Sequence, residues 1–244
     1  MSSIAIIFRR ELAAYFVTPL AYVVIFVFLL LTSSFTFYLG GFYDSNQADL
    51  APFFTYLPWI FLVIMPAISM RLWAEERSSG SIELLMTLPV TLWQAVVAKH
   101  LAAWCFAGIA IALTCPIWIT AAWLGDPDNG ATFIGYVGSL LMAGTYLAIG
   151  ACMSALTRNQ VIAFILGVVV CLAFLLTAFP IVHEFLAGAL PASIADALAS
   201  FSFLMRFQSI SKGVLDIRDL LFFLMMIGFW LTATAIVLDV KKAE

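Results

Sequence analysis

Long apolar segments separated by short polar stretches make up most of this chain. A transmembrane helix needs about 20 mainly apolar residues. The segments that meet this length lie at about 20–42, 52–71, 93–124, 132–155, 160–180 and 219–240. The sequence therefore predicts an all-α polytopic membrane protein with six transmembrane helices, built as one domain over residues 1–244, with no tandem repeat or interdomain linker.

A shorter amphipathic stretch precedes the first long segment. Its apolar residues recur at helical spacing: Ile4, Phe8, Leu12 and Tyr15. Arg9 and Arg10 project elsewhere and Pro19 ends the pattern, which predicts a helix lying in the membrane interface. A cleaved signal peptide is the alternative, but the apolar run over 20–38 is too long and no A-x-A site follows it. We expect this segment to be retained.

The longest polar interruption runs from Arg71 to Lys99. Its charged residues flank a Ser-Ser-Gly-Ser turn and are Glu75, Glu76, Arg77 and Glu83. After the turn, Ile82, Leu85 and Met86 fall at helical spacing until Pro89 prevents the helix from continuing. This predicts a short helix with one apolar stripe and with Ser79 or Ser81 as its N-cap. From the residues alone, a helix docked on a partner and a helix lying on the membrane surface explain the stretch equally well.

The run MRLWAEERSSGSIELLMTLPVT, residues 70–91, closely resembles the cytoplasmic loop between the second and third membrane helices of ABC-2 type transporter permeases. Within that superfamily the chain is most similar to the gliding-motility-associated branch, and the permeases of nitrous-oxide-reductase maturation are more distant. By segment order and motif, the resemblance covers essentially the whole chain. It implies an N-terminal elbow helix, a cytoplasmic coupling helix and a pair of re-entrant outer helices before the last span.

The resemblance also implies roles for individual residues. In the family, the coupling helix docks into a groove of a separate ATPase subunit. The residues that match the family's E-R-x-x-G-x-x-E pattern are Glu76, Arg77, Gly80 and Glu83. Those that match its docking helix are Leu84, Leu85, Met86 and Thr87. The implied elbow helix contains Phe8, Arg9, Arg10 and Glu11.

A second, weaker contact with the ATPase is implied at the brief turn after the fourth span, at Thr157, Arg158 and Asn159. From the residues alone, a snorkelling arginine that closes a tight helical hairpin explains this turn equally well.

The positions of the basic residues set the predicted orientation. With the N-terminus inside, eight of the eleven Lys and Arg residues are cytoplasmic: Arg9, Arg10, Arg71, Arg77, Lys99, Arg158, Lys241 and Lys242. The short outer loops contain only acids: Asp44, Asp49, Asp126 and Asp128. Both termini are therefore predicted to be cytoplasmic, in a bacterial inner membrane. The third span is longer than a bilayer needs, so we expect its first turns, with Lys99 and His100, to project into the cytoplasm.

The segment from Pro180 to Arg218 is amphipathic and irregular. Backbone at membrane depth must be helical or buried in protein, so two short helices dipping into the outer leaflet fit it. His183 beside Glu184 suggests a metal or proton site, but adjacent residues do not share a helix face. An interfacial polar pair is the preferred interpretation.

Composition narrows the function further. The chain is 64% hydrophobic and 10% charged, with a formal net charge of -3 and no basic cluster, which excludes nucleic-acid binding. It contains no G-x-x-x-x-G-K-[ST] motif, no H-E-x-x-H and no G-x-S-x-G. The four cysteines form no C-x-x-C pair. The middles of the predicted spans lack ionisable Asp, Glu, Lys, Arg and His, which disfavours an ion-coupled transporter.

These observations predict a permease subunit that binds no cofactor itself, with ATP and Mg²⁺ held by a partner ATPase. The expected partners are that cytoplasmic ATPase, a second permease copy in a homodimer, an auxiliary protein with an extracytoplasmic domain, and membrane lipid. A non-transporting scaffold that transmits ATPase-driven change to a periplasmic protein is the first alternative. A self-contained channel is the second.

Overall fold

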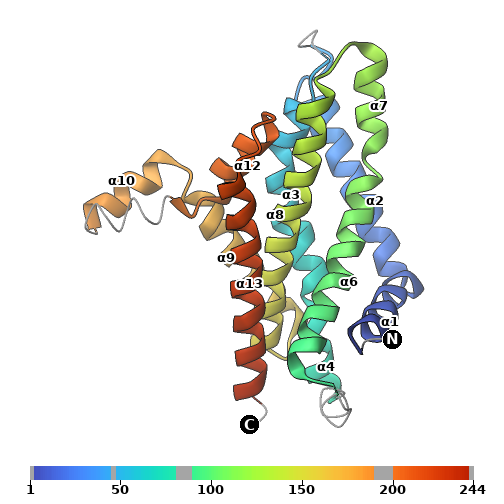
Figure 1. Cartoon of the computed structure of the whole chain (residues 1–244), viewed down its shortest axis with the longest axis vertical. Helices are drawn as coiled ribbons and strands as arrows, with labels where there is room; N and C mark the ends of the chain where they lie inside the picture. Colours follow the sequence, from blue (N-terminus) through green and yellow to red (C-terminus); the bar gives the residue numbers. More distant parts are fainter. Residues whose placement is uncertain (1–2, 45–47, 81–89, 190–199, 242–244) are drawn as a thin grey trace.

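The computed structural model describes residues 3–44, 48–80, 90–189 and 200–241, and within these ranges it contains helices and no strand (Figure 1). The helices of the first half are α1 (Ser3–Val17), α2 (Pro19–Ser34), the π-helical turn η1 (Phe35–Leu39), α3 (Ala51–Ser69), α4 (Arg71–Ser79) and α6 (Leu92–Ala112). Those of the second half are α7 (Cys115–Leu124), α8 (Asn129–Leu156), α9 (Gln160–Leu176), α10 (Pro180–Ala189), α12 (Phe203–Ser211) and α13 (Ile217–Val240).

Five helical segments of the described chain are long and apolar enough to cross a membrane. They are Pro19–Leu39, Ala51–Ser79, Leu92–Leu124, Asn129–Leu156 and Ile217–Val240. The predicted span at 160–180 forms α9, an apolar helix of 17 residues that is shorter than these five. An all-helical, multi-pass membrane protein is thus confirmed, and a sixth span stays a prediction.

Helix α8 lies at the centre of the bundle and is buried from Leu141 through Ala155. Its small residues explain why its neighbours approach so closely. A Cβ atom placed on Gly150 would lie 1.9 Å from the Ser69 Oγ of α3, and one on Gly144 would lie 2.7 Å from the Trp104 ring of α6. The small residues of the predicted fourth span are therefore packing residues.

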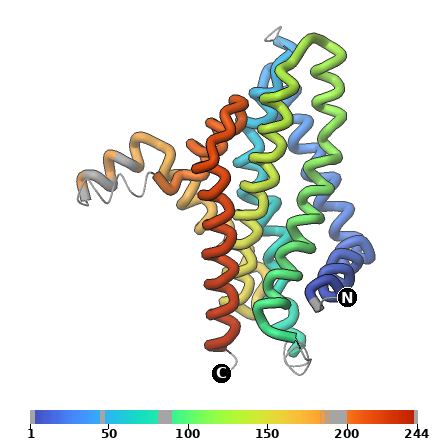
Figure 2. The backbone as a smooth tube through the Cα atoms, in the orientation of Figure 1, coloured from blue at the N-terminus to red at the C-terminus, as the bar shows by residue number. Residues whose placement is uncertain are grey.

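The bundle has two ends that differ in their elements. At the lower end in Figure 1, which we call the base, lie both chain termini, α4 and the turn between α8 and α9. At the upper end, which we call the top, lie the start of α3, the turn between α7 and α8, and the end of α12 (Figure 2). The start of α1 and the end of α13 therefore lie on the same side of the bundle.

Two local expectations need correction. The stretch after α3 is helical through Ser79, so Glu75, Glu76 and Arg77 lie on a helix and not in a loop. Ser79 is the last residue of α4 and not an N-cap, because Gly80 follows with a left-handed φ of 73° and ends the helix. The predicted third span corresponds to Leu92–Leu124, which is interrupted between α6 and α7 just before Pro116, a residue that cannot donate a backbone hydrogen bond.

The described residues of the segment over 180–218 include two short helices, α10 and α12, as expected. In Figure 1, α10 extends sideways from the bundle and α12 lies against α8 and α13. Their depth in a membrane stays a prediction.

Candidate functional site

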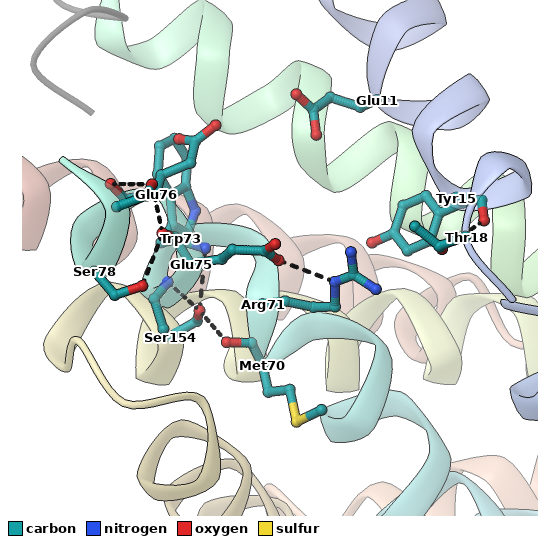
Figure 3. A network of polar contacts seen from close by, with 12 residues as sticks. Glu11, Tyr15, Thr18, Met70, Arg71, Trp73, Glu75, Glu76, Ser78 and Ser154 are labelled. Atoms are coloured by element: carbon teal, nitrogen blue, oxygen red, sulfur yellow. Dashed lines mark hydrogen bonds and ion pairs between the residues drawn. The ribbon is translucent and has the colours of Figure 1, made fainter. Parts of the chain in front are cut away.

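Helix α4 continues the direction of α3 after a break at Met70, and a residue of α8 fills this break. The backbone N–H groups of Trp73 and Ala74 donate to the Ser154 hydroxyl oxygen at 3.1 and 3.0 Å. The same hydroxyl donates to the carbonyl oxygen of Met70 at 2.7 Å (Figure 3). A hydroxyl has one donor and two acceptor positions, so Ser154 uses all three here. The start of α4 is thus capped by another helix.

A buried lysine joins α4 to two further helices. The Nζ atom of Lys99, on α6, lies 2.8 Å from Glu76 Oε1 on α4 and 3.1 Å from Glu11 Oε2 on α1. It also lies 5.3 Å from the ring centroid of Trp73. Only 3% of the Lys99 side chain is exposed. A buried cation is stable only when it is paired, so these contacts fix three helices relative to one another.

Helix α1 is anchored by this ion pair and by aromatic packing. Tyr15 stacks on Phe106 of α6, with ring centroids 4.8 Å apart and an interplanar angle of 11°. Burial raises the pKa of Tyr15 above its ordinary value, so its hydroxyl stays neutral. Burial also acts to raise the pKa of Glu11, but Lys99 and Arg10 outweigh it and hold that pKa below its ordinary value. Glu11 is therefore ionised at neutral pH.

A cavity of about 320 Å³ lies between α1, α4 and α6. Most of its lining is polar, from Glu11, Tyr15, Arg71, Glu75, Glu76, Ser79 and Lys99. Arg71 Nε and Glu75 Oε2 pair at 3.1 Å within α4. The space between α1 and α4 is therefore open to small polar groups, and the ion pairs of Lys99 bridge it.

The predicted docking residues divide between described and undescribed parts of the chain. Glu76 and Arg77 lie on α4, and Gly80 ends that helix. Arg77 Nη1 donates to the carbonyl oxygen of Ala155 at 2.6 Å, at the end of α8. The remaining predicted docking residues, Glu83, Leu84, Leu85, Met86 and Thr87, lie outside the described residues.

The turn predicted to make the second contact with the ATPase directly follows α8. The bond from Arg77 to Ala155 therefore brings α4 next to this turn. Asn159 caps α9, because its Oδ1 accepts from the N–H groups of Val161 and Ile162 at 2.9 and 3.4 Å. Thr157 Oγ1 accepts from the Asn159 N–H at 3.1 Å, and Arg158 is exposed. Thr157 and Asn159 thus shape the turn, and their contact with an ATPase stays a prediction.

The predicted elbow residues lie on α1. Arg9 and Arg10 are exposed and Phe8 is half-buried, while Glu11 contacts Lys99. The most buried residue of α1 is Ile7, which the predicted apolar stripe did not include.

Sequence reasoning missed Lys99 and Ser154 as parts of this site. We expected the first turns of α6, with Lys99 and His100, to project into the cytoplasm. Their side chains are buried among other helices, with 3% and 2% exposed, and the depth of these turns in a membrane stays a prediction. A single cation one or two turns into an apolar helix was a usable signal, because such a charge needs an acidic partner. Ser154 gave no signal, since a serine in a run of small residues is typical of helix packing.

A comparison with known families identifies the chain. The family model described as ABC-2 family transporter protein matches residues 42–238. The chain belongs to the ABC-2 transporter family. An ABC-2 protein of this kind is a membrane subunit, and membership implies a separate partner subunit that hydrolyses ATP. A comparison with curated proteins finds no match. The ABC-2 match covers α4, α6 and α8 but not α1, so the contacts of Glu11 are known from the structure alone.

Proposed function

We propose that this chain is the permease subunit of an ABC-2 transporter whose separate cytoplasmic ATPase subunits hydrolyse ATP. The permease would couple this hydrolysis to export of an amphiphilic or bulky substrate, or to work on an envelope partner. One observation carries the proposal: α4, which leads into residues 81–89, is capped by Ser154 of α8 and paired through Glu76 with Lys99 of α6. A force applied to that segment would reach the central helix directly.

The proposed docking surface consists of the end of α4 and the segment that follows it. Its residues are Glu76, Arg77, Gly80, Glu83, Leu84, Leu85, Met86 and Thr87. Arg77 supports this proposal because its bond to Ala155 brings the end of α4 beside the turn at Thr157, Arg158 and Asn159. Two segments that are distant in the sequence would thus face one ATPase subunit together.

Charge distribution supports an orientation with the base in the cytoplasm of a bacterium and the chain in its inner membrane. Helix α4 and the turn after α8 carry Arg71, Arg77 and Arg158 at the base. The turn between α7 and α8, at the top, carries Asp126 and Asp128 and no cation. Basic residues are retained on the cytoplasmic side of membrane proteins, so both termini would be cytoplasmic.

The substrate class follows from what the bundle core contains. The buried side chains of the central helix α8 are apolar, small or neutral, so a route along it would offer a small ion no charged ligand. This favours an amphiphilic or bulky cargo. Similarity to the gliding-motility-associated branch supports a homodimer with an auxiliary extracytoplasmic protein. Such a complex could perform export or mechanical work on the envelope, and experiments must separate these two functions.

The decisive experiment is purification of the chain from its native membrane in mild detergent, with identification of the proteins that accompany it. We expect an ATPase subunit to accompany the native chain and to be lost from Glu83→Arg. A matched control is Asp126→Arg, which reverses an acid at the top and should keep the ATPase.

Each other outcome rejects a defined part of the proposal. An ATPase absent from all three preparations would reject the transporter function and favour the channel. An ATPase retained by Glu83→Arg would place docking elsewhere. A reconstituted complex whose ATPase rate never responds to amphiphiles would favour the non-transporting scaffold.

A further inference from the structure

We infer that Lys99 is a positioning residue that carries movement of the docking segment from α4 to α1, an inference that rests on the proposed function. The Lys99 ammonium is shared by two carboxylates from different helices, Glu76 at 2.8 Å and Glu11 at 3.1 Å. Each carboxylate is largely buried, with 18% and 16% of its side chain exposed. Burial of this kind makes the three charges depend on one another.

Among the described residues, the ion cluster links α1 to α4 through Lys99 of α6. The cavity of about 320 Å³ lies between these two helices, so side-chain packing does not fill the space that separates them. Tyr15 and Phe16 both contact Phe106 of α6, and Phe16 also contacts Tyr22 of α2. Movement of α4 would therefore reach α1 through the charges of Glu76, Lys99 and Glu11.

The cluster is also joined to the helix cap at the start of α4. Trp73 donates its backbone N–H to Ser154, and its ring lies beside the Lys99 ammonium. A rotation of α4 about its junction with α3 would displace both Glu76 and Trp73 from Lys99. Because an unpaired buried ammonium is costly, Lys99 and Glu11 would follow that rotation and not separate from it.

A purely structural ion cluster would stabilise the base without responding to the ATPase. The two cases differ in a measurable property: a transmitting cluster makes the opening of α1 depend on the nucleotide state of the partner, and this dependence is lost when Glu11 loses its charge. Backbone amide exchange of residues 3–17 reports this opening and requires no knowledge of the cargo.

The experiment uses the purified complex of this chain with its ATPase, compared in the absence of nucleotide and when trapped with ATP and vanadate. The informative variant is Glu11→Gln, which removes the charge that pairs α1 with Lys99. It leaves Lys99 paired with Glu76, so no buried charge loses its last partner and the chain should fold. The matched control is Arg71→Gln, which removes an ion pair that lies wholly within α4.

In the native complex, trapping should change amide exchange in both α4 and α1, by about threefold or more in α1. In Glu11→Gln, the response of α4 should persist and the response of α1 should be lost. Arg71→Gln should keep both responses.

Two results would overturn the inference while leaving the proposed function intact. The first is a native-sized α1 response in Glu11→Gln, which would assign transmission to packing against Phe106. The second is an α4 response without any α1 response in the native complex. If no ATPase accompanies the chain at all, the proposed function fails, and the inference fails with it.

Discussion

The base and the top of the bundle are held together by different interactions. At the base, polar side chains bond to other helices: Ser154 to α4, Arg77 to α8 and Lys99 to both α1 and α4. Lys241, just after α13, likewise donates to the carbonyl oxygen of Leu156. The base is therefore a layer of directional bonds between segments that are distant in the sequence.

At the top, three of the acidic residues bond within their own segments, and one ion pair, between Arg206 of α12 and Asp219 of α13 at 2.7 Å, joins two helices. Asp49, Asp128 and Asp216 accept from backbone N–H groups two or three residues later, which starts α3, α8 and α13. The contacts between helices are mainly aromatic, as in the stack of Tyr136 on Phe53, at 5.6 Å, and on Trp118, at 5.7 Å. The top is joined mainly by ring packing.

This difference indicates a division of roles. Hydrogen bonds and ion pairs weaken steeply when distance or angle changes, so helices joined by them move together. Aromatic pairs are favourable over ring-centroid distances of about 4.5–7 Å and in several orientations, so helices joined by them can shift and remain in contact. The base is suited to receive a movement, and the top is suited to adjust to it.

The largest expected effect tests the ring packing of the top. Tyr136→Ala should lower the free energy of unfolding by about 3 kcal/mol, because it removes a ring that contacts α3 and α7. Tyr136→Phe removes only the bond between its hydroxyl and the Thr114 hydroxyl, 3.0 Å away, and should cost about 1 kcal/mol. Thermal unfolding in mild detergent measures both. Equal losses would mean that the top, like the base, depends on a polar bond.

A smaller effect tests the directional bonds of the base. Ser154→Ala removes the cap of α4 and should cost about 2 kcal/mol, because buried N–H groups lose their acceptor. It should also speed amide exchange at Trp73 and Ala74. The control is Ser139→Ala on the same helix, where an equally buried hydroxyl bonds only to the Gly135 carbonyl of its own helix and should cost under about 0.5 kcal/mol. Similar losses in the two variants would remove the distinction between a cap and an ordinary buried serine.

The smallest expected effect is a dependence of the stability of α1 on pH. The pKa of Glu11 in the folded chain lies below its ordinary value of 4.5, so its contribution to stability is complete above about pH 4.5. It is lost as the pH falls through the lower pKa of the folded state. The protection factors of the α1 amides, which are corrected for the intrinsic effect of pH on exchange, should therefore fall as the solution is acidified from pH 6 to pH 3, and Glu11→Gln should remove the Glu11 part of this fall. An identical profile in that variant would show that the pairing with Lys99 adds nothing to the base.

The helices of the bundle were predictable because membrane insertion imposes long apolar runs. The predicted spans 132–155 and 219–240 lie inside Asn129–Leu156 and Ile217–Val240, and the amphipathic stripe located α1. The continuation of the helix to Ser79 was not predicted, because a charged stretch resembles a loop until its partners are known. Here those partners are Ser154 and Lys99, from helices later in the chain.

The candidate site was predictable only in part, for a related reason. The E-R-x-x-G pattern marked Glu76, Arg77 and Gly80, and the first two make contacts with α6 and α8. Helical spacing shows which residues share a face but does not show which helix covers that face. Lys99 was therefore assigned to solvent, although Glu11 and Glu76 neutralise it in a buried position.

The cap that Ser154 supplies also constrains the order in which the chain matures. Ribosomes make Trp73 long before Ser154, so α4 emerges with its first amides lacking the acceptor they have in the finished fold. Only when α8 has been synthesised and inserted beside α3 can that first turn close. The start of α4 thus gains its acceptor late, after the central helix has joined the bundle.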